Sequence, residues 1–309
     1  MTTPSRAYRE IPVTHLGSGL ELKLGVHEIR GAGPGPVLGL TGAIHGDEMI
    51  GAEILRRVVQ TLNAAELRGT MRVMPVANPL AFEALTRNTP IDMNNLNRVF
   101  PGDPEGWLTE HMAHRITEEF LKPLDYYVDL HAGGAHPVVD YVYILNAEEL
   151  SRAFGSPVLY RPKAGYQGTT SETTVNLGIP SVTVELGGGP NEEAHILRGV
   201  RGVFNIMRKL GMLPGEPETP PKQTVVRHIG TIRPKFGGIL VPATGLETLG
   251  TVIEGRQVLA RIYNPMTLEL LETITAPYER NLMILLRGTV TKVHPGDYAY
   301  MIGDMSSAE

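Results

Sequence analysis

The sequence predicts an α/β protein with a mainly parallel sheet flanked by helices, followed by a small all-β domain. Apolar strands alternate with amphipathic helical segments from about residue 37 to residue 210, which is the pattern of a parallel sheet. A Pro- and Gly-rich stretch follows, and after it come only short strands separated by Gly-centred turns. We therefore divide the chain into a first domain (1–210), a linker (211–223) and a β-rich C-terminal domain (224–309).

The elements follow from local patterns along the chain. Weak alternation over residues 11–30 predicts a hairpin, and the Gly- and Pro-rich residues 31–36 predict a loop. Apolar runs and 3.6-residue periodicity then predict strands at 37–44, 71–77, 125–131, 138–145 and 181–186, and helices at about 47–62, 109–121, 170–178 and 191–210. Residues 86–106, rich in Asn, Pro and Gly, predict a long loop, and loops of this length are usually functional.

Two segments of the C-terminal part, residues 250–255 and 288–297, resemble the two halves of a lipoyl- or biotinyl-type barrel. Such carriers present a modifiable Lys on a hairpin between the halves. The corresponding hairpin here, residues 263–269, contains no Lys. The resemblance therefore implies a structural barrel or sandwich and no swinging arm.

Composition narrows the class of protein. The 309 residues are 42% hydrophobic and 20% charged, with a net charge of −5, which is typical of a soluble globular protein and disfavours nucleic acid as a partner. No apolar run is long enough to span a membrane, and the N-terminus lacks the apolar region of a signal peptide. We expect a cytoplasmic protein. Because the chain has no Cys, any bound metal must use His and carboxylate ligands.

Three predicted strands end in residues suited to zinc chemistry: His45-Gly46-Asp47-Glu48, Asp129-Leu130-His131, and Glu185. Ligands gather at the carboxyl ends of the strands in such a sheet, so we expect His45, Glu48 and His131 to converge on one metal ion. Two imidazoles, one carboxylate and an open position are typical of a catalytic zinc site. The alternatives are that Glu48 is a helix-start acid and that the pair in 129–131 is a buried ion pair.

Two carboxylates have predicted supporting roles. Asp129 shares a strand face with His131, and we expect it to accept a hydrogen bond from a ligand imidazole, that of His45. Glu185 ends an alternating β-branched run, where an acid is costly unless it is used or paired. It could serve as a general base, and the alternative is an N-terminal acid of the following helix.

The long loop carries candidate substrate contacts. Arg98 can bind a carboxylate with two parallel hydrogen bonds, and Asn97 beside it can share that role. Arg87 could stabilise an oxyanion together with zinc. Each arginine also has the alternative reading of a solvated surface charge.

These motifs together, with Leu96-Asn97-Arg98-Val99 and Val184-Glu185-Leu186-Gly187, make the chain similar to the succinylglutamate desuccinylase/aspartoacylase family of the zinc carboxypeptidase superfamily. The resemblance implies a zinc-carboxypeptidase-like sheet and one Zn²⁺ per chain. It implies zinc ligands at His45, Glu48 and His131 and a general base at Glu185. It also implies that Asn97 and Arg98 bind the substrate carboxylate and that Arg87 polarises the scissile carbonyl.

Within that family, residues 129–134 and 185–189 look closest to the deacetylase branch associated with ectoine breakdown, whose members remove acetyl from an N-acetylated diamino acid. We therefore expect a zinc-dependent amide hydrolase that cleaves a small N-acyl amino acid or a related amide. A metallocarboxypeptidase acting on short peptides and a non-catalytic binding protein that keeps the fold are the alternatives. The acyl group and the oligomeric state, including a homo-oligomer, stay open.

Overall fold

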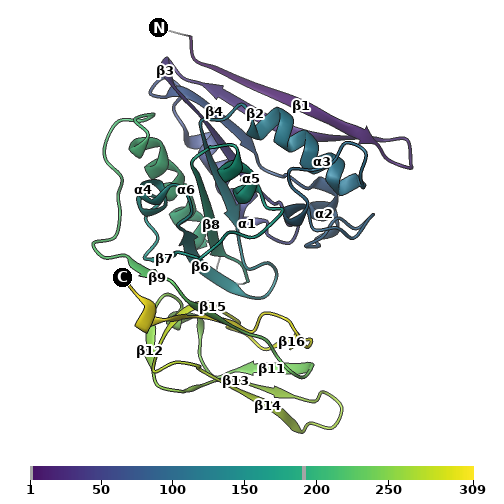
Figure 1. The fold of residues 1–309 in the computed structure, drawn as a ribbon, viewed down its shortest axis with the longest axis vertical. Helices are drawn as coiled ribbons and strands as arrows, with labels where there is room; N and C mark the ends of the chain where they lie inside the picture. The colour runs from purple at the N-terminus through teal and green to yellow at the C-terminus, as the bar shows by residue number, and fades with distance from the viewer. Residues whose placement is uncertain (1–2, 190–192) are drawn as a thin grey trace.

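A computed structural model describes residues 3–189 and 193–309. Its main feature is a large mixed sheet whose central strands are parallel, as predicted. Those strands are, in spatial order, β4 (Arg68–Met74), β3 (Gly33–Gly42), β5 (Tyr126–His131) and β8 (Ser181–Gly187). Figure 1 shows this sheet in the upper part of the molecule and a second group of strands below it.

The predicted N-terminal hairpin is present as β1 (Ser5–His15) and β2 (Glu21–Arg30), which pair antiparallel and extend the sheet beyond β4. The predicted loop at 31–36 is wrong, because β3 already begins at Gly33. Gly33 pairs with Arg68 of β4, and the Gly35 backbone packs so closely on it that a Cβ atom would lie 2.7 Å away. Glycines that predict a loop in the sequence instead allow two strands to approach closely.

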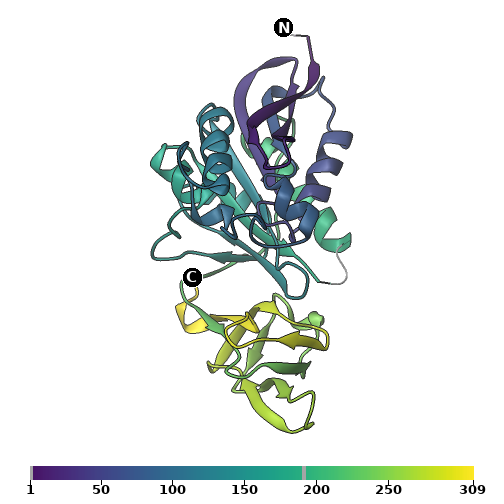
Figure 2. The same ribbon diagram turned by 90° about the vertical axis from the view of Figure 1, so that its right-hand side faces the viewer.

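Helices cover the sheet in two layers, visible edge-on in Figure 2. The first layer contains α1 (Ile50–Thr61), α4 (Glu148–Ala153) and α6 (Glu193–Lys209), which pack with the apolar side chains of one face. The second contains α3 (Leu108–Ile116), a π-helical turn η2 (Thr117–Leu121) and α5 (Thr170–Asn176). The predicted helix at 191–210 is confirmed from Glu193, and its first two residues lie outside the described residues.

Three short elements were not predicted: α2 (Pro79–Ala84), α4 and β7 (Val158–Tyr160). The signal for α2 is visible in hindsight. Asn78 accepts a hydrogen bond from the Ala81 amide at 3.1 Å, and Pro79 occupies the first helical turn, which are standard features of a helix start. The long loop at 86–106 is confirmed, with one 3₁₀ turn, η1 (Leu96–Arg98), inside it.

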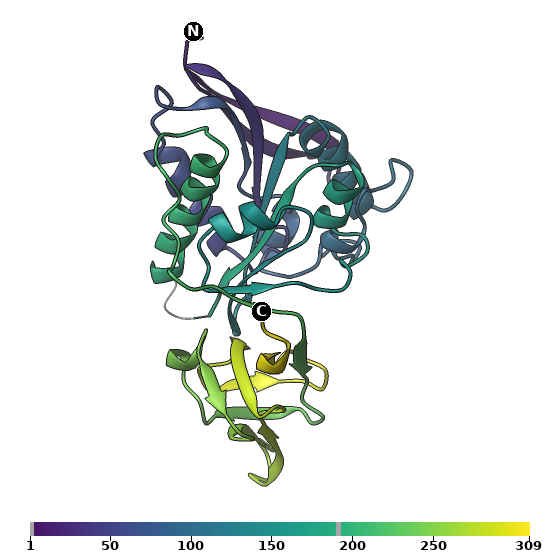
Figure 3. The same cartoon turned by 60° about the vertical axis from the view of Figure 1, so that its left-hand side comes forward.

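The C-terminal part is all-β, as predicted (Figure 3). Four of its strands form a separate sheet in the order β14 (Leu270–Thr275), β13 (Val258–Tyr263), β11 (Gly238–Pro242) and β16 (Thr291–Val293). The remaining strands, which join the large sheet, are β9 (Thr224–Val226), β10 (Ile229–Ile232), β12 (Val252–Glu254), β15 (Arg280–Leu286) and β17 (Tyr300–Asp304). Two further 3₁₀ turns, η3 (Leu246–Thr248) and η4 (Met305–Ser307), complete the element list.

The junction between the two parts of the chain is a strand pairing. β6 (Val138–Tyr143) lies antiparallel to β8 on one side and to β15 on the other, with Val139 opposite Leu285. C-terminal strands therefore continue the surface that carries the strand-end motifs. The division into domains at 210 and 224 stays a prediction. Across the described ranges, no helix combines the length and apolar character that a membrane crossing requires.

Candidate active site

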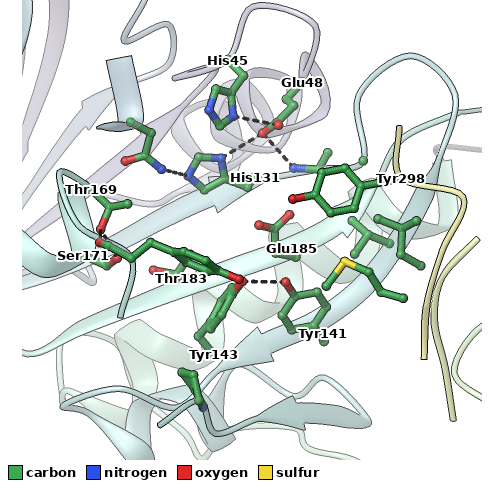
Figure 4. Close-up of a pocket in the computed structure, with 18 of the residues that line it drawn as sticks. His45, Glu48, His131, Tyr141, Tyr143, Thr169, Ser171, Thr183, Glu185 and Tyr298 are labelled. Atoms are coloured by element: carbon green, nitrogen blue, oxygen red, sulfur yellow. Dashed lines mark hydrogen bonds and ion pairs between the residues drawn. The ribbon is translucent and has the colours of Figure 1, made fainter. Parts of the chain in front are cut away.

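The predicted site residues converge at one edge of the main sheet. His131 ends β5 and lies opposite Glu185 of β8 in the parallel register. His45 comes three residues after the end of β3, which pairs with β5 on its other side. Because the carboxyl ends of parallel strands meet at one edge, residues distant in sequence line one pocket, which Figure 4 shows.

A sharp turn between β3 and α1 brings Glu48 back toward His45. Ala43 has a φ of 46°, and Gly46 packs so closely on the backbone of Ala81 that a Cβ atom would lie 2.0 Å from it. Any larger residue at position 46 would therefore displace α2 or the turn. The turn sets Oε1 of Glu48 2.8 Å from Nδ1 of His45.

His45, Glu48 and His131 form a compact buried cluster. One potential ligand atom from each lies within 4.8 Å of the other two, and the three residues are 2%, 3% and 4% exposed. The second carboxylate oxygen of Glu48 lies 2.9 Å from Nδ1 of His131 and accepts a hydrogen bond from the Ala132 amide at 3.1 Å. The two imidazoles and one carboxylate thus face a common point, as a metal site requires.

The electrostatics of the cluster follow from burial and close charges. Burial alone would raise the pKa of Glu48, but the charges and hydrogen bonds of His45 and His131 hold that pKa well below its ordinary value. Burial would likewise lower the pKa of His131, but the carboxylates of Asp129 and Glu48 raise it well above its ordinary value. Burial lowers the pKa of His45. Glu48 is therefore an ionised carboxylate between two imidazoles.

Asp129 contacts His131, and the expectation that it would bind His45 is wrong. Its Oδ2 lies 3.0 Å from Nε2 of His131, whereas Nε2 of His45 lies 3.2 Å from Oδ1 of Asn95. The reason is geometric, since Asp129 and His131 are two residues apart on one strand face. His45 lies beyond the end of its strand, and its ring meets the long loop instead.

Hydroxyl groups hold the Asp129 carboxylate in place. Thr41 of β3 donates to Oδ1 at 2.7 Å, and Thr170 of α5 donates to Oδ2 at 2.6 Å. Although burial acts in the opposite direction, His131 and these hydroxyls lower the pKa of Asp129. The carboxylate is therefore fixed and ionised beside the His131 ring, which is the arrangement that orients metal-binding imidazoles in proteins.

Glu185 lies beside the cluster and is partly exposed to the pocket. Burial in the protein interior, reinforced by the charge of Glu48, raises the pKa of Glu185 to about 8, against the opposing effect of His131. A carboxyl group with a pKa in this range can accept and release a proton near neutral pH. Figure 4 shows its carboxylate pointing into the pocket below the cluster.

The three candidates from the long loop also reach the pocket. Arg87 is half exposed and its Nη1 lies 3.0 Å from Oε1 of Glu48. Arg98 donates to the backbone carbonyl of Asn97 at 2.6 Å, and its guanidinium carbon lies 5.4 Å from the centre of the Tyr166 ring.

The Asn97 side chain is engaged with protein groups. Its Oδ1 accepts from the Thr170 amide at 3.0 Å, and its Nδ2 lies 3.2 Å from Nε2 of His131. In this structure Asn97 therefore helps to position His131 and the start of α5, a use that the sequence interpretation did not anticipate.

Several pocket residues were missed by sequence reasoning. The pocket has a volume of about 150 Å³, and its further lining residues include Tyr141, Tyr143, Tyr166, Thr183 and Tyr298. Tyr141 and Tyr143 alternate along β6 and Thr183 precedes Glu185 by two residues, so a known strand order would have placed them on the site face. No local signal assigns Tyr298, which follows the last turn before β17.

Comparison with known proteins gives matches in sequence. A family model of the succinylglutamate desuccinylase/aspartoacylase catalytic domain matches residues 34–210. The N-alpha-acetyl-L-2,4-diaminobutyric acid deacetylase of Halomonas elongata is 29% identical over 289 residues, which cover 88% of this chain and 83% of the relative.

Solved structures share the fold over nearly the whole chain. The product-bound ectoine utilization protein EutE (DoeB) of Ruegeria pomeroyi has a TM-score of 0.85 and 25% identity, covering 98% of this chain and 95% of that one. A succinylglutamate desuccinylase of Silicibacter has a TM-score of 0.83 and 24% identity, covering 99% and 95%. The second likeness concerns the fold alone, and both extend through the C-terminal β part.

Proposed function

Because the chain belongs to the succinylglutamate desuccinylase/aspartoacylase family, we propose that it is a zinc-dependent amide hydrolase that removes a small acyl group from an N-acyl amino acid. The observation that carries the proposal is the buried cluster of His45, Glu48 and His131, with Glu185 opposite His131 on the next strand. The Halomonas relative is named for deacetylation of an N-acetyl diamino acid, and we take acetyl as the first acyl group to test.

The donor set suits zinc. Two imidazole nitrogens and a carboxylate oxygen surround one point, and both oxygens of Glu48 already face imidazole rings. Three protein ligands of these types are characteristic of catalytic zinc sites. When bound there, one zinc ion per chain would supply Lewis acidity, which polarises a carbonyl and makes water more acidic. Asp129 would orient His131 for this task.

Glu185 would carry the proton. As a carboxylate it would take a proton from the attacking water and then deliver a proton to the amide nitrogen. A bond first forms between the water oxygen and the acyl carbon, and the carbon–nitrogen bond then breaks as the nitrogen receives the proton. The products are a carboxylate and a free amine. The raised pKa of Glu185, caused mainly by burial, suits a group that both accepts and returns a proton.

The arginines would bind and orient the substrate. Arg98 would bind the substrate carboxylate through two parallel hydrogen bonds, with Asn97 supporting that position from beside it. Arg87, which contacts Glu48 at the pocket, would face the acyl oxygen and stabilise the negative charge that develops there.

The test combines metal analysis with a substrate panel. Purified protein is analysed for zinc, and amine release from N-acetyl amino acids is measured with and without a chelator, beside a tripeptide. We expect about one zinc per chain and chelator-sensitive release from N-acetyl amino acids only. Zinc-independent release, or preferential cleavage of the tripeptide, would replace the proposal with a different hydrolase. Failure to bind zinc after reconstitution would remove the metal site.

A further inference from the structure

The pocket floor is a sheet surface whose side chains lie in rows across the strands. His131 of β5 lies opposite Glu185 of β8, and Glu185 lies opposite Tyr141 of β6. Alternate residues of a strand point to the same face. The row of His131, Glu185 and Tyr141 is therefore the middle row of the floor. Two residues away along the strands, a further row lies on each side of it, and these two rows carry different types of side chain.

One neighbouring row presents hydroxyl groups. It contains Thr183 of β8, which lies opposite Asp129 of β5, and Tyr143 of β6. Thr183 Oγ1 is buried and has no hydrogen-bond partner in the described part of the chain. Tyr141 donates its hydroxyl hydrogen to the Tyr143 oxygen at 2.8 Å, so the Tyr143 hydrogen is available to the pocket. Buried polar groups without partners are rare in proteins, which indicates that a ligand completes this row.

The hydroxyl row lies at the Arg98 end of the pocket. Thr170, which binds the Asp129 carboxylate, also donates its amide to Asn97, the neighbour of Arg98. The Arg98 guanidinium lies over the Tyr166 ring, and Tyr166 lines the same pocket as Tyr143. A substrate carboxylate on Arg98 would therefore bring the amino-acid part over the hydroxyl row.

The row on the other side of Glu185 is apolar. Val139 of β6 lies opposite Gly187 of β8, Leu285 of β15 lies opposite Val139, and Met301 of β17 lies opposite Leu285. All three apolar side chains line the pocket. None of the pocket-lining residues that β6, β15 and β17 contribute among the described residues is charged. Two strands of the C-terminal part thus supply two of the three apolar side chains of this row.

We propose that the substrate lies across the floor in one orientation, with its acyl group on the apolar row of Val139, Leu285 and Met301 and its amino-acid side chain on the hydroxyl row of Thr183 and Tyr143. This assignment rests on the proposed function and deepens it, because it names what each end selects. The apolar row selects a short uncharged acyl group, since burying an acyl carboxylate there would leave the charge unpaired. The hydroxyl row selects a hydrogen-bonding side chain.

The test measures the activity of variants of the two rows on two series of substrates. One series varies the acyl group on a fixed amino acid, from acetyl to butyryl and succinyl. The other keeps the acetyl group and compares 2,4-diaminobutyrate with norvaline, whose side chain has the same length but ends in a methyl group. The measured quantity is kcat/KM for each pair of substrate and protein.

Variants of the apolar row should change only the acyl ranking. Leu285→Ala should raise the butyryl-to-acetyl ratio of kcat/KM about 10-fold, because a pocket one side chain larger admits the longer acyl group. Met301→Lys should make the N-succinyl substrate detectable by supplying a cation. Met283→Ala is the matched control, because Met283 is equally buried on β15 but packs in the core of the C-terminal part and does not line the pocket.

Variants of the hydroxyl row should change only the amino-acid ranking. Thr183→Val and Tyr143→Phe should each lower the preference for diaminobutyrate over norvaline by about 3- to 10-fold, the effect of one lost hydrogen bond. Thr183→Ser keeps the hydroxyl and should restore the preference. Tyr160→Phe is the control for Tyr143, because Tyr160 packs beside it without lining the pocket.

The outcomes separate the orientation from the activity. Rankings that change along the predicted series support the orientation. If the Thr183 variants change the ranking of acyl groups and the Leu285 variant changes the ranking of amino acids, the substrate lies in the reverse orientation. If active variants leave both rankings unchanged, the proposed orientation is wrong. Absence of hydrolysis by the unmodified, zinc-loaded protein would remove the proposed function itself, and the orientation with it.

Discussion

The buried cluster and the apolar row of the pocket floor are built by different interactions. Around the buried cluster, side chains from β3, β5, the long loop and α5 are fixed by short hydrogen bonds, such as those from Thr41 and Thr170 to Asp129. At the apolar end, Val139, Leu285 and Met301 lie in register on β6, β15 and β17 and contact the pocket through hydrocarbon alone.

This difference separates reactivity from selectivity. Hydrogen bonds are directional, and a buried network loses much of its stabilisation when one member is missing. Apolar surfaces tolerate changes of similar volume at small cost. Substitutions in the C-terminal strands should therefore alter which acyl group is accepted, whereas substitutions near Asp129 and Glu185 should alter whether the reaction proceeds.

The largest expected effect is at Glu185. Glu185→Gln keeps the size of the side chain and removes the group proposed to transfer protons, so kcat should fall by about 10²- to 10⁴-fold. Zinc content and melting temperature should stay close to those of the unmodified protein. Glu254→Gln, an exposed acid of β12, is the control. A Glu185→Gln protein with normal kcat would assign the proton transfer to another group.

The next effect concerns the support of His131. Asp129→Asn removes the carboxylate that lies 3.0 Å from the His131 ring, and zinc affinity should fall by about 10- to 100-fold. Competition with a chromophoric chelator measures this affinity. Asp125→Asn is a matched control, because Asp125 lies just before β5 and accepts a hydrogen bond from the Val37 amide at an exposed position. Equal affinities in both variants would mean that Asp129 does not support the metal site.

The same contrast explains what the sequence could predict. Convergence of His45, His131 and Glu185 follows from a rule about strand ends that needs no knowledge of side-chain contacts. The partner of Asp129 could not be predicted in this way, because it depends on which ring lies over the strand. The apolar row depends on the pairing of β6 with β15, and no local pattern specifies the register between strands so far apart in sequence.

Short elements escaped prediction for a related reason. α4 and β7 contain six and three residues, which is too few for a hydrophobic period to emerge. The glycines before Val37 were interpreted as a loop because their use in close strand packing becomes visible only when β4 is beside them. Local patterns thus predicted the long elements and the strand-end chemistry, and tertiary contacts determined the rest.

A third prediction concerns the face of β6 that points away from the pocket. Asp140, between Val139 and Tyr141, is buried and lies 2.5 Å from the Arg198 guanidinium. Burial raises the pKa of Asp140 even beside this arginine. When the pKa of a carboxyl group is higher in the folded state than in the unfolded state, the folded protein becomes less stable as the pH rises through that pKa. Removal of Arg198 would raise the folded-state pKa of Asp140 further.

We therefore expect Arg198→Met to lower the free energy of unfolding by about 2 kcal/mol at pH 7, the cost of leaving a buried acceptor without its partner, and the deficit should shrink as the pH is lowered toward 5. Denaturant unfolding at several pH values measures both effects, with the exposed Arg201→Met as control. The acyl ranking should not change, because the pocket face of β6 is untouched. A deficit that grows at low pH would contradict the assignment to an unpaired Asp140 carboxylate.

The smallest expected effect concerns the interactions that fix Tyr298, a pocket residue from the C-terminal part. Tyr298 points its hydroxyl group into the pocket in Figure 4, and two arginines hold it. Arg287 Nε donates to its carbonyl oxygen at 2.7 Å, and the guanidinium carbon of Arg233 lies 4.2 Å from the centre of its ring. Arg287 is buried, so its hydrogen bond fixes the loop from inside the C-terminal part.

Arg287→Met should release this loop while keeping the volume of the side chain. One lost hydrogen bond of about 1 kcal/mol corresponds to a rise in KM of roughly 5-fold, with kcat nearly unchanged, because the metal cluster and Glu185 keep their own hydrogen bonds. Arg280→Met, at the exposed start of β15, the strand that ends just before Arg287, is the matched control. A fall in kcat without a change in KM would mean that the C-terminal part acts on the reaction as well as on binding, and the separation of reactivity from selectivity would not hold.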